Sequence, residues 1–233
     1  MGLKLKKTLL TEKISRESKW LGIASLLVLI ALFGLSDELL HANGQLVFAQ
    51  GQYWRAFTTT FVHADYKHLA HNSVFFTGLA ILLNNYFGNL IFPLVSLLMG
   101  GIINLIVLKF YPAHVYLVGI SGVVYFMAAM WLTLYLMIER TISFKSRLII
   151  ALGLSLIFLA PEVVLREEVS YLAHGVGFGL GIPSALLFYY FNRSEILSYE
   201  RWEEQRPDPQ WVKEWEEQNQ LLSEDETSLH NHV

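Results

Sequence analysis

Long apolar runs separated by short polar stretches dominate the pattern of this chain. A helix needs roughly 20 apolar residues to cross a bilayer. Six stretches approach or reach that length, at residues 20–35, 67–87, 90–109, 119–138, 147–165 and 169–191. The first follows a basic segment, but no clear small-x-small cleavage site follows Leu35, which favours a signal anchor over a cleaved signal peptide. The pattern predicts an all-α membrane protein, a bundle of six transmembrane helices.

Composition agrees with this expectation. Of the 233 residues, 54% are hydrophobic and 16% are charged, and the mean hydropathy is +0.41. An ordinary soluble domain is about 25% charged. The chain has no cysteine, which excludes disulfides, thiolate metal sites and a cysteine nucleophile. The net charge of −3 gives no indication of nucleic-acid binding.

The basic residues predict the orientation. Most of the 17 lie before the first span, between the fourth and fifth, or after the sixth. These are Lys4, Lys6, Lys7, Lys13, Arg16 and Lys19, then Arg140, Lys145 and Arg147, then Arg193, Arg201, Arg206 and Lys213. By the positive-inside rule both termini are cytoplasmic. We expect a multi-pass integral membrane protein of the bacterial inner (plasma) membrane.

The same pattern suggests three parts. Residues 1–19 form a basic cytoplasmic arm, residues 20–191 form one helical bundle, and residues 192–233 form an acidic cytoplasmic tail that contains three tryptophans. The longest connection, residues 39–66, is rich in aromatic residues. Tryptophan and tyrosine favour the membrane interface, so we expect this connection to lie there.

Ser121 stands between Gly119 and Gly122 where the fourth apolar run begins. Glycine lets other groups approach the backbone closely. The start of a helix offers unpaired N–H groups and the positive end of the helix dipole, both of which stabilise negative charge. These are the surroundings that a nucleophilic serine requires, although glycine and serine also serve as packing residues in membrane helices.

Other polar residues lie inside the apolar runs, where they are costly and commonly functional. His68 and Asn72 are four residues apart on one face of the second span. In the sixth span His174, Gly177 and Gly181 share a face, as do Ser121, Tyr125 and Ala128 in the fourth. Small residues on both faces would let these two helices approach closely, and would bring Ser121 and His174 together.

Such a pair can hydrolyse a peptide bond. Ser121 would be the nucleophile and His174 the base that takes its proton and returns it to the leaving amine. The Ser121 N–H, His68 and Asn72 would stabilise the oxyanion. No carboxylate is evident to orient His174, which predicts a dyad, with Tyr125 holding the imidazole by stacking.

Alternatives stay open at this point. Histidine and asparagine in membrane helices also serve as packing or interhelical hydrogen-bonding residues. Metal binding by His63, His68, His71 and His174 is conceivable, but H-E-x-x-H is absent. Haem held between His68 and His174 is the sharper rival, although it leaves Ser121 and its glycines unexplained.

Together these residues resemble the rhomboid family of intramembrane serine proteases, across essentially all of residues 20–191. Trp54-Arg55 resembles the first-loop motif of the family, and His63, His68 and Asn72 match its H-x4-H-x3-N. Residues 119–122 match the G-x-S-G motif, with Tyr125 at the family's tyrosine. Ala173, His174, Gly177 and Gly181 match the A-H-x-x-G-x-x-x-G of the last core helix.

The resemblance implies a six-helix bundle with a water-accessible cavity, the nucleophile at Ser121, the base at His174, and assistance to the oxyanion from His68 and Asn72. It implies cleavage of transmembrane or juxtamembrane segments of membrane proteins, without a cofactor, or client binding by an inactive relative. It does not specify an oligomeric state. The chain departs from the family in carrying Asn84, with Gly88 after it, where a glutamate is common, and Ala129 where a glycine is common.

Overall fold

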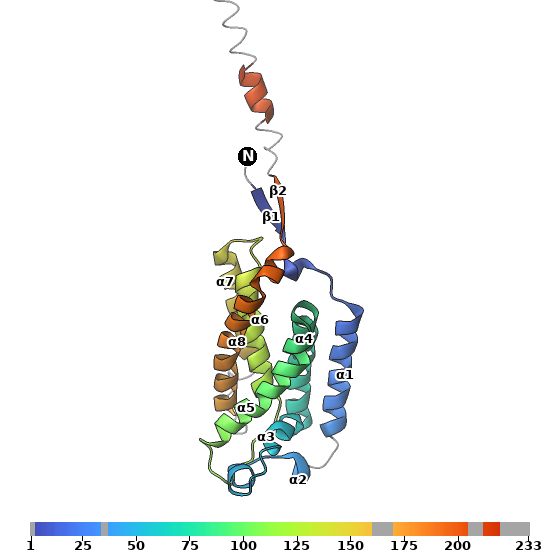
Figure 1. Ribbon diagram of the computed structural model, residues 1–233, viewed down its shortest axis with the longest axis vertical. Helices are drawn as coiled ribbons and strands as arrows, with labels where there is room; N and C mark the ends of the chain where they lie inside the picture. Colours follow the sequence, from blue (N-terminus) through green and yellow to red (C-terminus); the bar gives the residue numbers. More distant parts are fainter. Residues whose placement is uncertain (1–2, 34–36, 160–169, 205–211, 220–233) are drawn as a thin grey trace, which may run out of the picture. The chain divides into compact units, whose positions relative to one another are not determined.

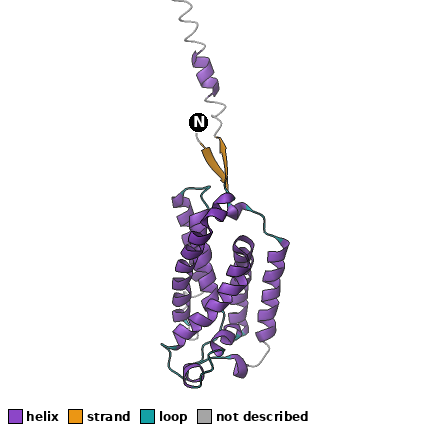
Figure 2. Ribbon diagram, viewed as in Figure 1, coloured by secondary structure: helices purple, strands orange, loops and turns teal. Residues whose placement is uncertain are grey.

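Helices make up most of the residues that the computed structural model describes, which are 3–33, 37–159, 170–204 and 212–219. The long helices are α1 (Arg16–Phe33), α4 (Tyr66–Asn89), α5 (Ser96–Leu108), α6 (Ser121–Ile138), α7 (Phe144–Leu159) and α8 (Tyr171–Ser198) (Figure 1). Among the described residues, strands occur only as β1 (Leu3–Lys7) and β2 (Arg201–Glu204) (Figure 2). Each apolar run that the sequence predicts as a span therefore contains a helix.

The chain divides into two compact units. The first comprises Lys7–Glu200 and contains all six long helices. In the second, β1 pairs with β2 in a two-stranded sheet, and Lys6 forms an ion pair with Glu203 at 3.9 Å. The start of the predicted basic arm is thus joined to the start of the predicted acidic tail. Residues 212–219 form a further short helix.

The helices of the first unit differ in their suitability for a membrane. By length and composition, three stretches of the described residues are able to cross one: Tyr66–Leu108, α6 and α8. The first has 43 residues and combines α4 and α5 through the π-helical segment η4 (Leu90–Val95). Its backbone leaves helical geometry at Gly88, where φ is 76°, and again at Phe92. Figure 1 shows α4 and α5 as separate helices on either side of this kink.

The core is centred on α6, which contacts α4, α5, α7 and α8. Every residue from Ser121 to Met130 is buried. A helix with neighbours on all sides has no polar face to present, and this explains why residues 123–132 are almost uniformly apolar. The more exposed α1 and α8 carry many apolar side chains on their outer faces.

The connection between α1 and α4 forms short helices that pack against the bundle. It contains α2 (Asp37–Leu40), the π-helical η2 (Gln45–Ala49), α3 (Arg55–Thr58) and the 3-10 turn η3 (Thr59–Phe61). Arg55 donates to two backbone carbonyls of the same connection, at 2.9 and 3.0 Å. Phe57 packs against Gly101 of α5, where a β-carbon would lie 2.1 Å from its ring. Trp54, 49% exposed, is one of its outward-facing aromatics.

Asn84 links three parts of the chain near the end of α4. Ser18 of α1 donates to its side-chain oxygen at 2.8 Å. Its amide nitrogen donates to the Asn89 side-chain oxygen at 2.7 Å and to the Phe92 carbonyl at 2.9 Å. Asn84 therefore connects α1, α4 and the kink through a neutral group that donates as well as accepts.

Asn84→Asp is expected to destabilise the protein by about 1–3 kcal/mol, because the carboxylate cannot donate to the buried Phe92 carbonyl. The measurement is thermal unfolding in detergent. Asn89→Asp is the matched control, since the exposed Asn89 accepts from the Asn84 amide through its side-chain oxygen at 2.7 Å and aspartate keeps that bond. Equal melting temperatures for the two variants would contradict the assigned donor role.

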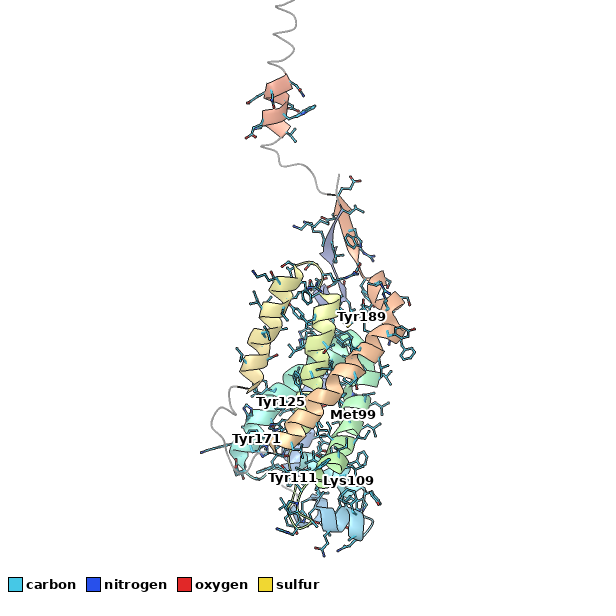
Figure 3. The ribbon with its side chains drawn as sticks, turned by 90° about the vertical axis from the view of Figure 1, so that its left-hand side faces the viewer. Met99, Lys109, Tyr111, Tyr125, Tyr171 and Tyr189 are labelled. Carbon is cyan, nitrogen blue, oxygen red and sulfur yellow. The ribbon has the colours of Figure 1, made fainter. Side chains whose placement is uncertain are left out.

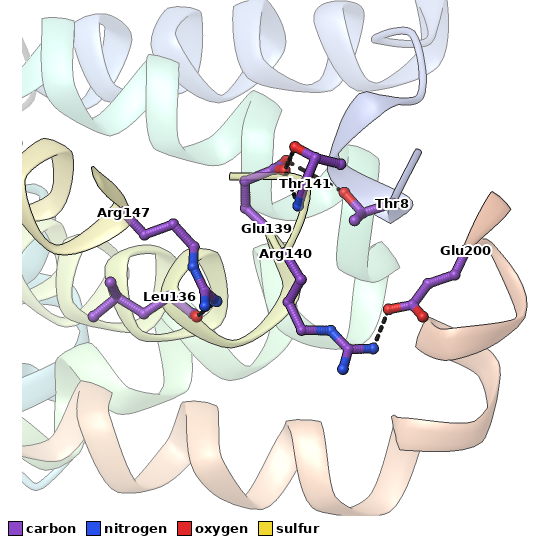
Figure 4. A network of polar contacts seen from close by, with 7 residues as sticks. All are labelled: Thr8, Leu136, Glu139, Arg140, Thr141, Arg147 and Glu200. Atoms are coloured by element: carbon purple, nitrogen blue, oxygen red, sulfur yellow. Dashed lines mark hydrogen bonds and ion pairs between the residues drawn. The ribbon is translucent and has the colours of Figure 1, made fainter. Parts of the chain in front are cut away.

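A second polar network holds the turn between α6 and α7 (Figure 4). Glu139 accepts from Thr141 within this turn and from Thr8 near the N-terminus, the latter at 3.3 Å. Arg140 pairs with Glu200, which follows α8. Arg147 of α7 donates to the Leu136 carbonyl. These contacts fix the ends of α6 and α8 at the side of the bundle opposite to the start of α6.

Candidate active site

Ser121 is the first residue of α6 and is 9% exposed. The strained turn before it requires glycine, because Gly119 has a φ of 107°, a value that side chains with a β-carbon rarely adopt. The Gly119 N–H donates to the Thr59 carbonyl at 3.3 Å. Thr59 also donates through its hydroxyl to the Leu117 carbonyl. The backbone that leads into Ser121 is therefore held from the side by η3.

His68 and Asn72 lie against this turn. A β-carbon added to Gly119 would lie 2.8 Å from His68 Cε1 and 3.9 Å from Asn72 Nδ2. Asn72 is buried, and its Nδ2 has no hydrogen-bond partner among the residues that the structure describes. Buried donors are normally satisfied, so this amide is a donor available to a bound group. Both side chains come from the first two turns of α4, which Asp65 caps by accepting from the His68 N–H at 2.8 Å.

His63 precedes α4 and packs against His68, with ring centroids 5.2 Å apart and ring planes at 70°. Its Nδ1 lies 3.2 Å from the Phe61 carbonyl. Burial, followed by the proximity of the His68 ring, lowers the pKa of His63 to about 4. His63 is thus neutral at physiological pH and supports the His68 ring without adding a charge beside it.

His174 lies in the first turn of α8 and is buried. Its ring stacks on that of Tyr125, with centroids 4.3 Å apart and planes at 9°. The Tyr171 ring stands edge-on to it at 6.3 Å. The sequence predicted the stacking by Tyr125. It did not indicate the second aromatic, because Tyr171 falls outside every spacing pattern used above.

Glycines allow α6 and α8 to approach closely. A β-carbon on Gly177 would lie 2.2 Å from the Gly122 carbonyl oxygen, and one on Gly181 would lie 2.5 Å from the Phe126 carbonyl oxygen. One on Gly122 would be 3.7 Å from Ala173 Cβ. Gly122 follows Ser121 and Ala173 precedes His174, so the predicted approach of the two small faces brings the neighbours of both residues into contact.

A further contact near His174 could not be predicted from the sequence. Tyr111, in the connection between α5 and α6, donates its hydroxyl to Ser170 Oγ at 2.8 Å. Ser170 caps α8 by accepting from the Ala173 N–H at 3.2 Å. Tyr111, Tyr125 and Tyr171 lie toward the same end of the bundle (Figure 3). Nothing in the sequence relates residue 111 to residue 170, and only the fold brings them together.

The described residues contain no group of three or more histidine, aspartate or glutamate side chains able to hold a metal ion. His68 packs between Gly119 and His63, and the His174 ring is stacked on Tyr125. Both imidazole rings therefore pack against other residues of the protein. The candidate groups at this end of the bundle are a hydroxyl at a helix start, an imidazole and an amide donor, which are the groups that acyl transfer requires.

One protein-family model covers the region of the chain that contains these residues. The model described as Rhomboid domain matches residues 50–191, which include every candidate residue above. No match to an individual curated protein accompanies it. With its apolar helices the chain is an integral membrane protein, and the family match covers more than half of its length. The chain belongs to the rhomboid family.

Proposed function

We propose that this protein is an intramembrane serine endopeptidase that cleaves transmembrane or juxtamembrane segments of membrane proteins. The observation that carries the proposal is the Gly119 turn, which presents Ser121 at the start of α6 with His68 and Asn72 packed beside it. Members of the family generally are serine proteases that act on membrane proteins within the bilayer. A merely structural turn would not require the buried Asn72 amide beside it, whose Nδ2 has no hydrogen-bond partner among the described residues.

In this mechanism Ser121 Oγ attacks the carbonyl carbon of the scissile peptide bond, and His174 takes the hydroxyl proton. The carbonyl oxygen becomes an oxyanion, which accepts hydrogen bonds from the Ser121 N–H, the Asn72 amide and the His68 ring. His174 then returns the proton to the departing amine, which leaves an acyl-enzyme. Water, deprotonated by His174, hydrolyses this ester and restores Ser121.

The stacking of Tyr125 takes the place of an orienting carboxylate. A flat ring at 4.3 Å limits rotation of the imidazole, and such pairs are stabilised beyond their buried area. The dyad would operate in a site of low dielectric, where fixed donors act more strongly than in water. We place it near the outer surface of a six-span bundle in the bacterial inner membrane, with both termini in the cytoplasm.

A fluorophosphonate probe tests this proposal directly, because it reacts with an activated serine and not with an ordinary one. Purified protein in detergent is expected to be labelled once, with the adduct on the peptide that contains Ser121. Ser73→Ala is a suitable control, since Ser73 is also a buried serine, and labelling should persist. An unlabelled protein that also fails to cleave a transmembrane substrate in proteoliposomes would favour an inactive, client-binding family member.

Tyr111→Phe is expected to lower kcat by about two- to twelvefold, the equivalent of one neutral hydrogen bond of about 0.5–1.5 kcal/mol. The reason is that the Tyr111 hydroxyl steadies Ser170, which caps the turn that carries His174. Rates of substrate cleavage and of probe labelling should fall together. Tyr116→Phe, at an exposed ring in the same connection, is the control, and equal rates for both variants would contradict the role of Tyr111.

A further inference from the structure

A cavity of about 240 Å³ lies at the opposite end of the bundle from Ser121, where the ends of α4 and α8 meet the 3-10 turn η1 (Leu9–Thr11). This volume corresponds to about eight water molecules. Its walls combine aromatic rings with oxygen acceptors, contributed by Tyr86, Phe87, Phe188, Asn192, Glu195 and Tyr199. In Figure 3 the label of Tyr189 marks this end of α8, and that of Tyr171 marks the other.

The electrostatics of the cavity favour a cation. Among the described residues that line it, Glu195 is the only acidic one, and none is a lysine or arginine. The ion pairs between described residues are Lys6–Glu203 and Arg140–Glu200, so the Glu195 carboxylate takes part in neither. The last turn of α8 also contains no basic residue, and the C-terminal end of a helix carries partial negative charge.

The aromatic walls suit the same ligand. Phe87 and Phe188 are packed edge to face at 5.5 Å, and Tyr86 lies 6.3 Å from Phe87. Faces of such rings attract ammonium groups. Asn192 donates its amide nitrogen to the Phe188 carbonyl at 2.9 Å, which leaves its side-chain oxygen to accept. Two oxygen acceptors among aromatic rings match a primary ammonium, which has three N–H donors, better than a quaternary one, which has none.

The residues around the cavity indicate which kind of molecule carries this ammonium group. Leu90 lines the cavity and is 57% exposed, and Leu94 beyond it is 60% exposed. On α8, Tyr190 and Phe191 are 74% and 76% exposed, directly before Asn192. Exposed apolar side chains on η4 and α8 suit the acyl chains of a lipid whose headgroup enters the cavity. We propose that this cavity binds the ammonium group of phosphatidylethanolamine, independently of the catalytic site.

Lipid binding to the purified full chain tests the assignment, with native mass spectrometry used to follow dihexanoyl phosphatidylethanolamine. Glu195→Gln is expected to weaken this binding by up to about fivefold, which is the largest factor expected for an exposed charge pair. Glu204→Gln, which changes an exposed carboxylate outside the cavity, should leave it unchanged. Dihexanoyl phosphatidylglycerol should bind more weakly, and Glu195→Gln should not weaken it further.

Three results would overturn the proposal. Equal binding of phosphatidylcholine would show that the site does not select a primary ammonium. Equal binding of free O-phosphoethanolamine would show that the acyl chains contribute nothing, so that the ligand is soluble. Unchanged phosphatidylethanolamine binding by Glu195→Gln would place the lipid elsewhere. Probe labelling of Ser121 should be retained in Glu195→Gln, so failure here is distinguishable from failure of the protease proposal.

Discussion

Ser121→Ala, His174→Ala and the double variant are all expected to lose cleavage of a transmembrane substrate to nearly the same low level. Residues that act as one catalytic unit are grossly non-additive, and loss of either one costs on the order of 10⁴–10⁶ in turnover. In the proposed mechanism His174 activates the Ser121 hydroxyl, so neither residue would contribute to acylation without the other. The measurement is kcat for each purified variant in proteoliposomes, under identical lipid conditions.

The stacked arrangement of His174 and Tyr125 requires a check that the variants keep their fold. Melting temperatures in detergent should remain close to that of the wild type for Ser121→Ala, and should fall modestly for His174→Ala, which loses the ring packed at 4.3 Å. Losses that multiply in the double variant would mean that the two residues act independently, and the dyad would then be wrong. Retained cleavage by Ser121→Ala would exclude the serine mechanism altogether.

Gly177→Val is expected to reduce turnover on the order of 10²-fold and to destabilise the bundle by about 1–3 kcal/mol or more. Even a single β-carbon at this position would lie 2.2 Å from the Gly122 carbonyl oxygen, which is backbone and cannot rotate away. The helices must therefore separate by about 1 Å, a displacement that misplaces Ser121 relative to His174. Cleavage kinetics and thermal unfolding in detergent report the two effects.

Gly179→Val is the matched control for this variant. It places the same side chain two residues further along α8, where a β-carbon meets no atom within 4 Å. Helix propensity and added apolar surface then change in the same way in both variants, and only the clash with α6 differs. Gly179→Val should keep nearly normal turnover and melting temperature. Similar losses in both would show that valine acts through α8 itself and not through the α6–α8 contact.

The helices of the bundle could be predicted well because their signal is local. An apolar run of membrane length has few other structures available, so α4 and α6 begin within about two residues of the predicted starts. The end of α8 was predicted less accurately. It continues to Ser198, past the predicted limit at residue 191, because polar residues can extend a helix once it leaves an apolar environment. The predicted residues 34–35, 160–165 and 169 lie outside the described part of the chain.

The candidate site could likewise be predicted only in part from the sequence. Glycine, serine, histidine and asparagine at fixed spacing revealed which faces of three helices carry polar groups, since the 3.6-residue period is a property of the helix itself. The sequence also predicted that α6 and α8 meet through small residues. The roles of Ser121 and His174 themselves are still predictions, which the labelling and mutation experiments address.

Contacts between segments distant in sequence could only come from the tertiary structure. Thr59 holds the Gly119 turn, Tyr111 holds Ser170, and β1 pairs with β2 across nearly the whole chain. Each depends on one hydrogen bond or one strand pair, which leaves no periodic trace in the sequence. Apolar length and helical period thus determined which segments are helices and which faces are polar. Only the tertiary structure decided which loop residues support those faces. These contacts depend on how the helices pack together and not on the sequence of any single helix.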